Sequence, residues 1–195
     1  MSKMRNAIAV FVAAALVGFA FTSSESIKDS GNGSTVKWLA KQVTGQHEGT
    51  VNFGKMDINF DEAGTMTSAN FAVDMTTIKN TDLDEGSATK LVGHLKSADF
   101  FDTENHPYSM FKATSIQSMG KGSYEITGDL TIKEITNSIT FKAVATNIDG
   151  KVMANAKVII DRSKFDVKYR SGSFFESLGD KLIYDDFELD INIVK

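Results

Sequence analysis

The chain has 195 residues, a length that suits one domain or two small ones. Its formal net charge is −4, and its lysines are scattered without forming a basic cluster, which argues against a nucleic-acid partner. Because the chain has no cysteine, disulfides, thiolate nucleophiles, cysteine-rich zinc sites and iron–sulfur clusters are excluded.

The first residues have the pattern of a secretory signal peptide. Lys3 and Arg5 supply a positive start, and an apolar run over residues 7–21 follows. The run has about 15 residues, fewer than the ~20 that a membrane-spanning helix needs, although a retained N-terminal anchor is the alternative. We therefore expect residues 1–20 to be cleaved and the mature protein to be periplasmic or secreted, without stable insertion in a membrane.

The mature chain divides into a short leader and one domain. Residues 21–33 are rich in Ser, Gly, Asn and charge, which is typical of a flexible segment. Over residues 34–195 the apolar side chains mostly alternate with polar ones, the pattern of strands with one buried and one wet face. Turn signals, such as residues 45–49, separate about eight predicted strands. These strands span residues 36–43, 50–60, 66–75, 108–116, 124–132, 139–145, 152–160 and 183–193.

Two segments depart from simple alternation. The parity of the apolar residues changes at Gly54–Lys55, where a β-bulge would restore a common apolar face. Between positions 88 and 95 apolar residues recur at helical spacing, with acidic residues before them and lysines among and after them. Residues 82–97 therefore predict a helix of about three turns, packed over one mouth or seam of the sheet.

The fold class is all-β, either a closed barrel or a sandwich. The chain has 14 Phe and 8 Met, side chains that suit a wide and adaptable apolar lining, and this favours the barrel. A well-filled sandwich core is the alternative. Periodicity does not distinguish a filled barrel from a hollow one.

No polar motif indicates catalysis or metal binding. His47, His94 and His106 lack the spacing of metal ligands, and the nucleophile-elbow, Walker and Rossmann motifs are absent. His47 is interpreted as a polar turn residue. His94 and His106 are candidates for head-group contacts, with surface or capping roles as the alternative. Arg162 either locks a loop or contacts a head group. Asp185 falls on the inward parity, so it must be paired or lie at the rim.

Six segments of the chain form a recognisable series. They are Trp38 with residues 44–51 (TGQHEGTV), 71–75 (FAVDM), 94–102 (HLKSADFFD), 106–111 (HPYSMF), 124–133 (YEITGDLTIK) and 161–165 (DRSKF). In this order they resemble one family, the YceI-like proteins, a bacterial group of exported lipid-binding proteins. The resemblance covers about residues 34–194. It implies a lipocalin-like eight-stranded antiparallel β-barrel with the short helical segment packed on it. It also implies a long isoprenoid or similar chain in the lumen and a homodimer. Glu134 stands where the family usually has Gly, which leaves the conformation of that turn open.

We therefore predict a periplasmic carrier of an isoprenoid-like, quinone-like or fatty lipid, with no cofactor and no covalent chemistry. The predicted apolar lining consists of Trp38, Phe53, Ile58, Phe71, Val73, Met75, Leu91, Leu95, Phe100, Phe101, Met110, Ile126, Leu130, Phe141 and Phe187. The alternatives are a ligand-free stress-response or interaction module and, third, an enzyme acting on a lipid or sugar.

Overall fold

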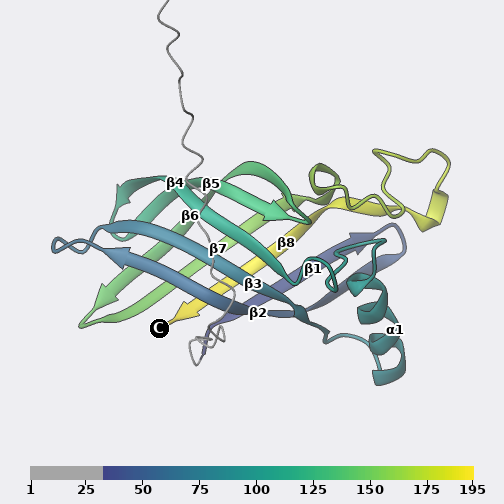
Figure 1. The fold of residues 1–195 in the computed structure, drawn as a ribbon, viewed down its shortest axis with the longest axis horizontal. Coiled ribbons are helices and arrows are strands. Elements are labelled where there is room, and N and C mark those ends of the chain that lie inside the picture. The colour runs from purple at the N-terminus through teal and green to yellow at the C-terminus, as the bar shows by residue number, and fades with distance from the viewer. Residues whose placement is uncertain (1–32) are drawn as a thin grey trace, which may run out of the picture.

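The computed structural model describes residues 33–195 and shows a closed antiparallel barrel of eight strands in chain order, with β8 pairing back onto β1 (Figure 1). The predicted signal peptide and all of the leader except Gly33 lie outside the described residues. The strands are β1 (Thr35–Gln42), β2 (Gly45–Phe60), β3 (Met66–Asn80), β4 (Tyr108–Gly120), β5 (Ser123–Ile132), β6 (Ile135–Ile148), β7 (Lys151–Asp161) and β8 (Ile183–Val194). The helical elements are α1 (Glu85–Lys96) and the 3₁₀ turns η1 (Arg162–Phe165) and η2 (Gly179–Lys181). The barrel prediction is thereby confirmed and the sandwich alternative is wrong.

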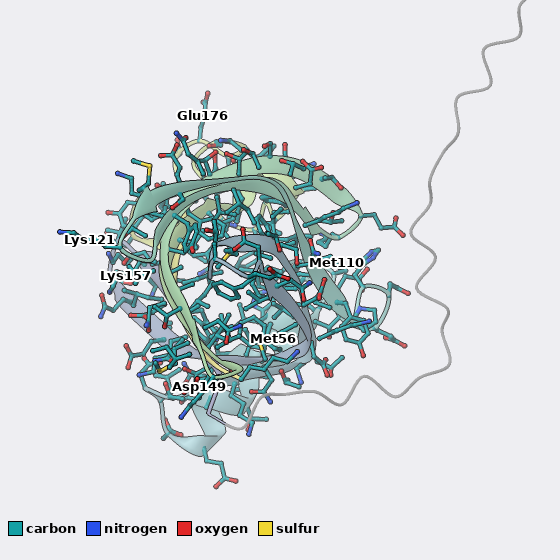
Figure 2. The ribbon with its side chains drawn as sticks, turned by 90° about the vertical axis from the view of Figure 1, so that its left-hand side faces the viewer. Met56, Met110, Lys121, Asp149, Lys157 and Glu176 are labelled. Carbon is teal, nitrogen blue, oxygen red and sulfur yellow. The ribbon has the colours of Figure 1, made fainter. Side chains whose placement is uncertain are left out.

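The strands enclose one continuous apolar core. Inward-facing residues from all eight strands form a single cluster, and Figure 2 shows their side chains filling the space that the strands surround. The cluster closes on itself where Val36 of β1 lies opposite Ile191 of β8 on one side and Val51 of β2 on the other. Alternation along each strand therefore decides which side chains meet inside the barrel.

The predicted bulge lies in β2. The register between β2 and β3 shifts between Phe53 and Lys55, so that one extra residue is accommodated. Phe53 on one side of the bulge and Met56 and Ile58 on the other are all buried in the core. The strand itself begins earlier than predicted. Residues 45–49 have the composition of a turn, yet they pair with β1 from Gln42 to Trp38.

The two ends of the barrel differ. At the end that we call the hairpin end, the connections are the short turns 61–65, 121–122 and 149–150. At the opposite, helical end lie α1 and the long connection over residues 162–182 (Figure 1). The predicted helix is confirmed, and Asp84 caps its N-terminus, since its carboxylate accepts from the backbone N–H groups of Gly86 and Ser87.

Tyr124 seals the hairpin end. Its side chain is buried, and its hydroxyl donates to the carbonyl of Gly64 at 3.5 Å and accepts from the N–H of Met66 at 3.1 Å. The start of β5 is thereby tied to the β2–β3 hairpin across the interior. The lumen is consequently closed at this end by a hydrogen-bonded aromatic side chain.

The turn at Glu134 keeps the conformation that glycine would favour. Lys133 and Glu134 have φ angles of 50° and 66°, so both lie in the left-handed region, as a two-residue type I′ hairpin requires. Ile132 and Ile135 pair directly on either side of the turn. The hairpin geometry is therefore retained although neither central residue is glycine.

Phe111 lies over a glycine of the neighbouring strand. A Cβ built on Gly128 would lie 2.4 Å from Cζ of Phe111 and 2.5 Å from the carbonyl oxygen of Lys112. The absence of a side chain on Gly128 thus makes room for an aromatic ring inside the barrel. Gly93 on α1 is the opposite case, because nothing lies within 4 Å of a Cβ at that position.

We expect Gly128→Ala to lower the free energy of unfolding by about 1–3 kcal/mol, because the added methyl overpacks against Phe111 and the backbone. Gly93→Ala is the matched control and should raise the free energy of unfolding by about 0.5–1 kcal/mol, since it removes a helical glycine without a clash. Urea unfolding of both variants measures the difference. Equal effects of the two substitutions would contradict the packing of Phe111 on Gly128.

Candidate functional site

Two apolar cavities follow one another along the lumen. The cavity towards the hairpin end has a volume of about 90 Å³, and its walls include Val36, Phe53, Ile58, Met66, Phe71, Phe111, Ile126, Leu130, Phe141 and Ile191. The cavity towards the helical end has a volume of about 100 Å³ and is lined by Trp38, Val51, Val73, Met75, Ile78, Leu95, Phe101, Ser109, Ile132, Phe187 and Leu189. No charged side chain lines either cavity.

Val73 and Leu189 form the waist of the lumen. Both residues line both cavities, so they stand where the two cavities adjoin. Val73 comes from β3 and Leu189 from β8, and both side chains are half-buried. A molecule that occupied the full length of the lumen would have to pass between them.

Trp38 lines the helical-end cavity with its indole ring. Its Nε1 atom is buried and has no hydrogen-bond partner among the described residues. The indole ring is held against Gly49, where a built Cβ would lie 2.5 Å from Cζ2 and 2.7 Å from Cε2. Ser109 of β4 faces the same cavity and is also buried.

Most of the predicted lining residues face a cavity. Trp38, Phe53, Ile58, Phe71, Val73, Met75, Leu95, Phe101, Ile126, Leu130, Phe141 and Phe187 do so. Leu91, Phe100 and Met110 do not. Met110 has the outward parity of β4, and its neighbours Ser109 and Phe111 line the cavities instead. Leu91 lies a turn of α1 away from Leu95, the one helical residue that reaches the lumen.

Phe100 and His94 belong to a cluster outside the two cavities. The ring of His94 meets the rings of Phe100 and Tyr169 edge-on, with centroid distances of 4.9 and 4.5 Å. His94 also contacts the carboxylate of Asp99 at 2.9 Å. The cluster therefore joins α1 to the connection after β7 across the helical end. His106 is likewise outside the cavities and lies 3.8 Å from Asp102, at ion-pair distance.

Sequence reasoning missed several lining residues. Phe111, Ile139, Leu189 and Ile191 all line a cavity, and the last three lie on predicted inward parities. The alternation of apolar and polar residues was therefore sufficient to predict these three as lining residues. Ile78 also lines a cavity, but it lies beyond residue 75, the predicted end of its strand. β3 continues past that residue after a register shift with β2 between positions 50 and 52.

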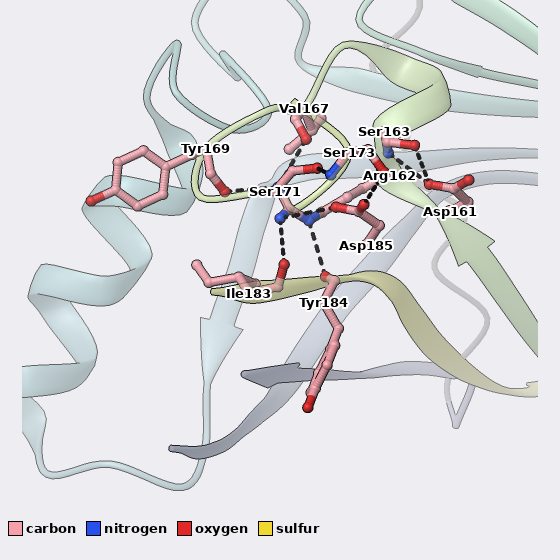
Figure 3. A network of polar contacts seen from close by, with 10 residues as sticks. All are labelled: Asp161, Arg162, Ser163, Val167, Tyr169, Ser171, Ser173, Ile183, Tyr184 and Asp185. Carbon is pink, nitrogen blue, oxygen red and sulfur yellow. Dashed lines mark hydrogen bonds and ion pairs between the residues drawn. The ribbon is translucent and has the colours of Figure 1, made fainter. Parts of the chain in front are cut away.

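Arg162 locks the connection after β7 (Figure 3). The residue is 4% exposed. Its guanidinium donates at 2.8–3.2 Å to the backbone carbonyls of Val167, Tyr169, Ile183 and Tyr184. Nη2 also lies 3.3 Å from Oδ1 of Asp185, whose other carboxylate oxygen accepts from Ser173 Oγ at 2.6 Å. The structure thus places Arg162 in the loop-locking role, with each of its guanidinium nitrogens already bonded, and not at a cavity wall.

The charge of Arg162 is balanced within this network. Burial lowers the pKa of the Arg162 guanidinium from its ordinary value, while the carboxylates of Asp185 and Asp161 act in the opposite direction. Asp185 is paired, as its inward parity requires. A guanidinium keeps its proton in proteins, so the pair remains ionic.

Two further observations concern residues 33–195. They contain no group of three or more His, Asp or Glu side chains placed to hold a metal ion. Within the same residues, no helix has the length and apolar character that crossing a membrane requires.

Comparison with known proteins places this barrel among related sequences. The model of the YceI-like domain matches residues 28–195. Over 86 residues the chain is 31% identical to a UPF0312 protein of Vibrio parahaemolyticus, which covers 44% of this chain and 42% of that protein. Over 79 residues it is 37% identical to the protein YceI of Escherichia coli, 40% of each chain. The matched segments thus span less than half the length of these curated relatives.

Solved structures share the fold. BcnA of Burkholderia cenocepacia has a TM-score of 0.66 at 22% identity, covering 83% of this chain and 96% of that chain. A YceI protein of Campylobacter jejuni has a TM-score of 0.57 at 20% identity, covering 72% and 79%. A polyisoprenoid binding domain from Saccharophagus degradans has a TM-score of 0.57 at 11% identity, covering 83% and 92%. At these identities the likeness concerns the fold alone.

Arg162→Ala should lower the free energy of unfolding by about 3–5 kcal/mol, because it leaves Asp185 and four buried or partly buried carbonyls without their donor. Lys157→Ala is the matched control. It breaks an exposed ion pair with Asp190 and should change stability by about 0.5 kcal/mol or less. Urea unfolding compares the two. If Arg162→Ala proved as mild as Lys157→Ala, the locking role of Arg162 would be wrong.

Proposed function

The chain belongs to the YceI-like domain family, and from that premise we propose that it is an exported carrier or reservoir for a long apolar, isoprenoid-like chain. The chain would be held in the barrel lumen without covalent chemistry. The observation that supports this proposal most is the pair of cavities arranged end to end and lined almost wholly by apolar side chains.

Burial of methylene groups supplies the affinity. Each CH₂ transferred from water into an apolar lining contributes about 0.8 kcal/mol, so ten buried units offset the cost of ordering a flexible chain. The absence of charged side chains from both cavity walls suits such a ligand, because no charge has to be desolvated when it binds.

A long ligand requires the lumen to adapt. Each cavity is smaller than the ~300–1,000 Å³ of typical ligand pockets. The walls include Met66 at one end and Met75 at the other, and methionine side chains rotate readily to fill or vacate space. The side chains of Phe71 and Phe53, whose ring centroids lie 5.7 Å apart, are further groups that could rotate to make space. We propose that the ligand joins the two cavities into one channel by displacing these side chains.

We propose that the protein acts outside the cytoplasm, on the basis of its N-terminal pattern. A positive start before a short apolar run supports export to the periplasm or beyond, which an exported lipid carrier requires. The family resemblance supports a homodimer as the assembled form. The structurally similar domain from Saccharophagus degradans is named for polyisoprenoid binding, which is in line with the ligand class proposed for this chain.

The direct test is organic extraction of the protein after purification from a bacterial periplasm, followed by mass spectrometry. We expect an isoprenoid or comparable apolar lipid in near-stoichiometric amount. A heat-denatured and refolded sample, washed with detergent, is the control for lipid carried along by purification. A protein that yields no lipid and takes up none on incubation with bacterial lipid extract would rule out the carrier function.

Val73→Trp should obstruct the waist of the lumen and expel the lipid while the barrel remains folded, since the lumen has space on both sides of Val73. In a filled core the same overpacking would cost ~1–3 kcal/mol or more. Val144→Trp is the matched control, because Val144 faces outward on β6 and is 51% exposed. Bound lipid and melting temperature are measured together on both variants. Full lipid retention by Val73→Trp would exclude a ligand that spans both cavities.

A further inference from the structure

We propose that Phe174 and Phe175, on the connection after β7, insert into the surface of a lipid bilayer and so dock the helical end of the barrel on a membrane. The inference rests on the proposed function in that an isoprenoid-like cargo is a membrane lipid. It adds to that function a partner, the bilayer, and the orientation in which the barrel meets it.

Phe174 and Phe175 form an exposed aromatic pair. The two residues are 45% and 50% exposed, although large apolar side chains are usually covered in a folded protein. Figure 1 shows the yellow-green connection reaching beyond the strands at the helical end, and Figure 2 shows Glu176 projecting from the surface. The aromatic pair therefore lies on a protruding loop and not in a groove. The residues on either side of it are small or charged and are exposed as well: Gly172, Ser173, Glu176 and Ser177.

The backbone that carries the aromatic pair is fixed to the barrel. The N–H groups of Phe174 and Phe175 donate to the carbonyl of Ser171 at 3.2 and 3.0 Å. Ser171 is fully buried and bridges to Ile183 at the start of β8, whose carbonyl accepts from Arg162. Because the network of Arg162 already orders this connection, little conformational entropy is lost when the two rings insert.

The size of the aromatic pair decides which partner it fits. A fully buried Phe covers about 150–250 Å², so two half-exposed rings offer at most a few hundred Å². A stable protein interface buries about 800 Å² on each partner. Tyr184 is 50% exposed, but it extends away from Ser171 and Ser173 of this loop and does not enlarge the patch (Figure 3). A bilayer needs no complementary surface, because apolar side chains enter it to a depth of about 5–10 Å wherever they meet it. The pair is therefore suited to a bilayer and is too small for a stable contact with a second protein.

The charge of the connection is compatible with a membrane surface. Over residues 166–182 three acidic residues are balanced by three basic ones, whereas the whole chain has a net charge of −4. Nζ of Lys168 lies 5.2 Å from the centroid of the Phe174 ring, so this ammonium group accompanies the ring to the depth of the lipid phosphates. Lys168 also pairs with Asp166. Insertion of the rings, and not attraction between charges, is therefore the main driving force.

The loop lies at the end of the barrel where a cargo would pass. Tyr169 on the same connection meets His94 of α1, with ring centroids 4.5 Å apart. Leu95, the residue after His94, lines the helical-end cavity. The opposite end is sealed by Tyr124. Docking through the aromatic pair therefore places the mouth of the lumen against the bilayer, so that an apolar chain crosses little water.

A fluorophore reports on the insertion directly. The chain has no cysteine, so Glu176→Cys creates one site for an environment-sensitive label beside the intact aromatic pair. Glu62→Cys is the matched control, because it also removes one exposed acid but lies in the β2–β3 turn of the hairpin end. The probe is a vesicle of phosphatidylethanolamine and phosphatidylglycerol. We expect a blue shift of the emission, and quenching by brominated acyl chains, for the label at position 176 and neither for the label at position 62.

Substitution of the aromatic pair tests the driving force. Phe174→Ser combined with Phe175→Ser should weaken binding to the same vesicles by roughly tenfold or more, because two apolar side chains no longer enter the bilayer. Met119→Ser combined with Ile148→Ser is the matched control, since both residues are 58% exposed and lie at the hairpin end. Its binding should stay within about twofold of the parent protein. Vesicle sedimentation measures the binding, and every variant is purified from the periplasm as the parent protein is, so that all share one N-terminus.

Several results would overturn the inference. Unchanged vesicle binding by the double variant at positions 174 and 175 would exclude the aromatic pair as the anchor. Equal emission shifts at positions 62 and 176 would exclude this orientation. A dimer of the parent protein that the double variant does not form would assign the pair to a second copy of the chain. The labelled Glu176→Cys protein decides the matter if the double variant does not fold.

Lipid measurements on the same samples separate this inference from the proposed function. We expect the double variant to hold geranylgeraniol loaded from detergent as the parent protein does, because neither Phe174 nor Phe175 lines a luminal cavity. Parent protein that carries lipid but does not bind vesicles would overturn the docking alone. Parent protein that binds vesicles but neither contains nor takes up lipid would overturn the carrier function alone.

Discussion

Closure of the sheet between β1 and β8 is the constraint on which the rest of the structure depends. A closed sheet has no edge strand, so the backbone groups of each strand can find partners on both sides. Closure also fixes which residues face inward. A one-residue slip in one strand would exchange its inward and outward side chains, and both neighbouring strands would then have to shift as well. The bulge at Phe53–Lys55 resolves such a change within β2 and keeps Met56 and Ile58 inside.

The difference between the two ends follows from their connections. Short turns and the hydrogen bonds of Tyr124 close the hairpin end, where opening would break buried contacts. The helical end is covered by α1, which has no fully buried residue, and by a connection that Arg162 ties down. Its link to α1 is the aromatic cluster around His94. Elements with few buried contacts open at the lowest cost, so access to the lumen is expected between α1 and the connection after β7, where this cluster would have to separate.

Much of the fold could be predicted from the sequence, because alternation and turn residues are local signals. The helix before Ser97 and the bulge at Gly54 were predicted for this reason. The start of β2 was not, since residues 45–49 have a turn composition and become a strand only by pairing with β1. Met110 was assigned to the lumen although its neighbours Ser109 and Phe111 have the inward parity, which is visible only once the register with β3 is known.

The candidate site was less predictable than the fold. Hydrophobicity and parity identify lining residues one at a time, but they do not show that Val73 and Leu189 meet between two cavities. The two roles considered for Arg162 differ only in the direction of its donors, and that direction depends on carbonyls about twenty residues away in β8. The relation between Trp38 and Gly49 likewise arises from strand pairing, because the two residues face each other across β1 and β2.

An apolar lumen alone gives affinity without much selectivity. Each buried methylene contributes about the same free energy wherever it lies, so a long chain could slide along the cavities with little preference. In this barrel the apolar walls would therefore set how tightly a chain binds, and the waist between Val73 and Leu189 would set how far along the lumen it reaches.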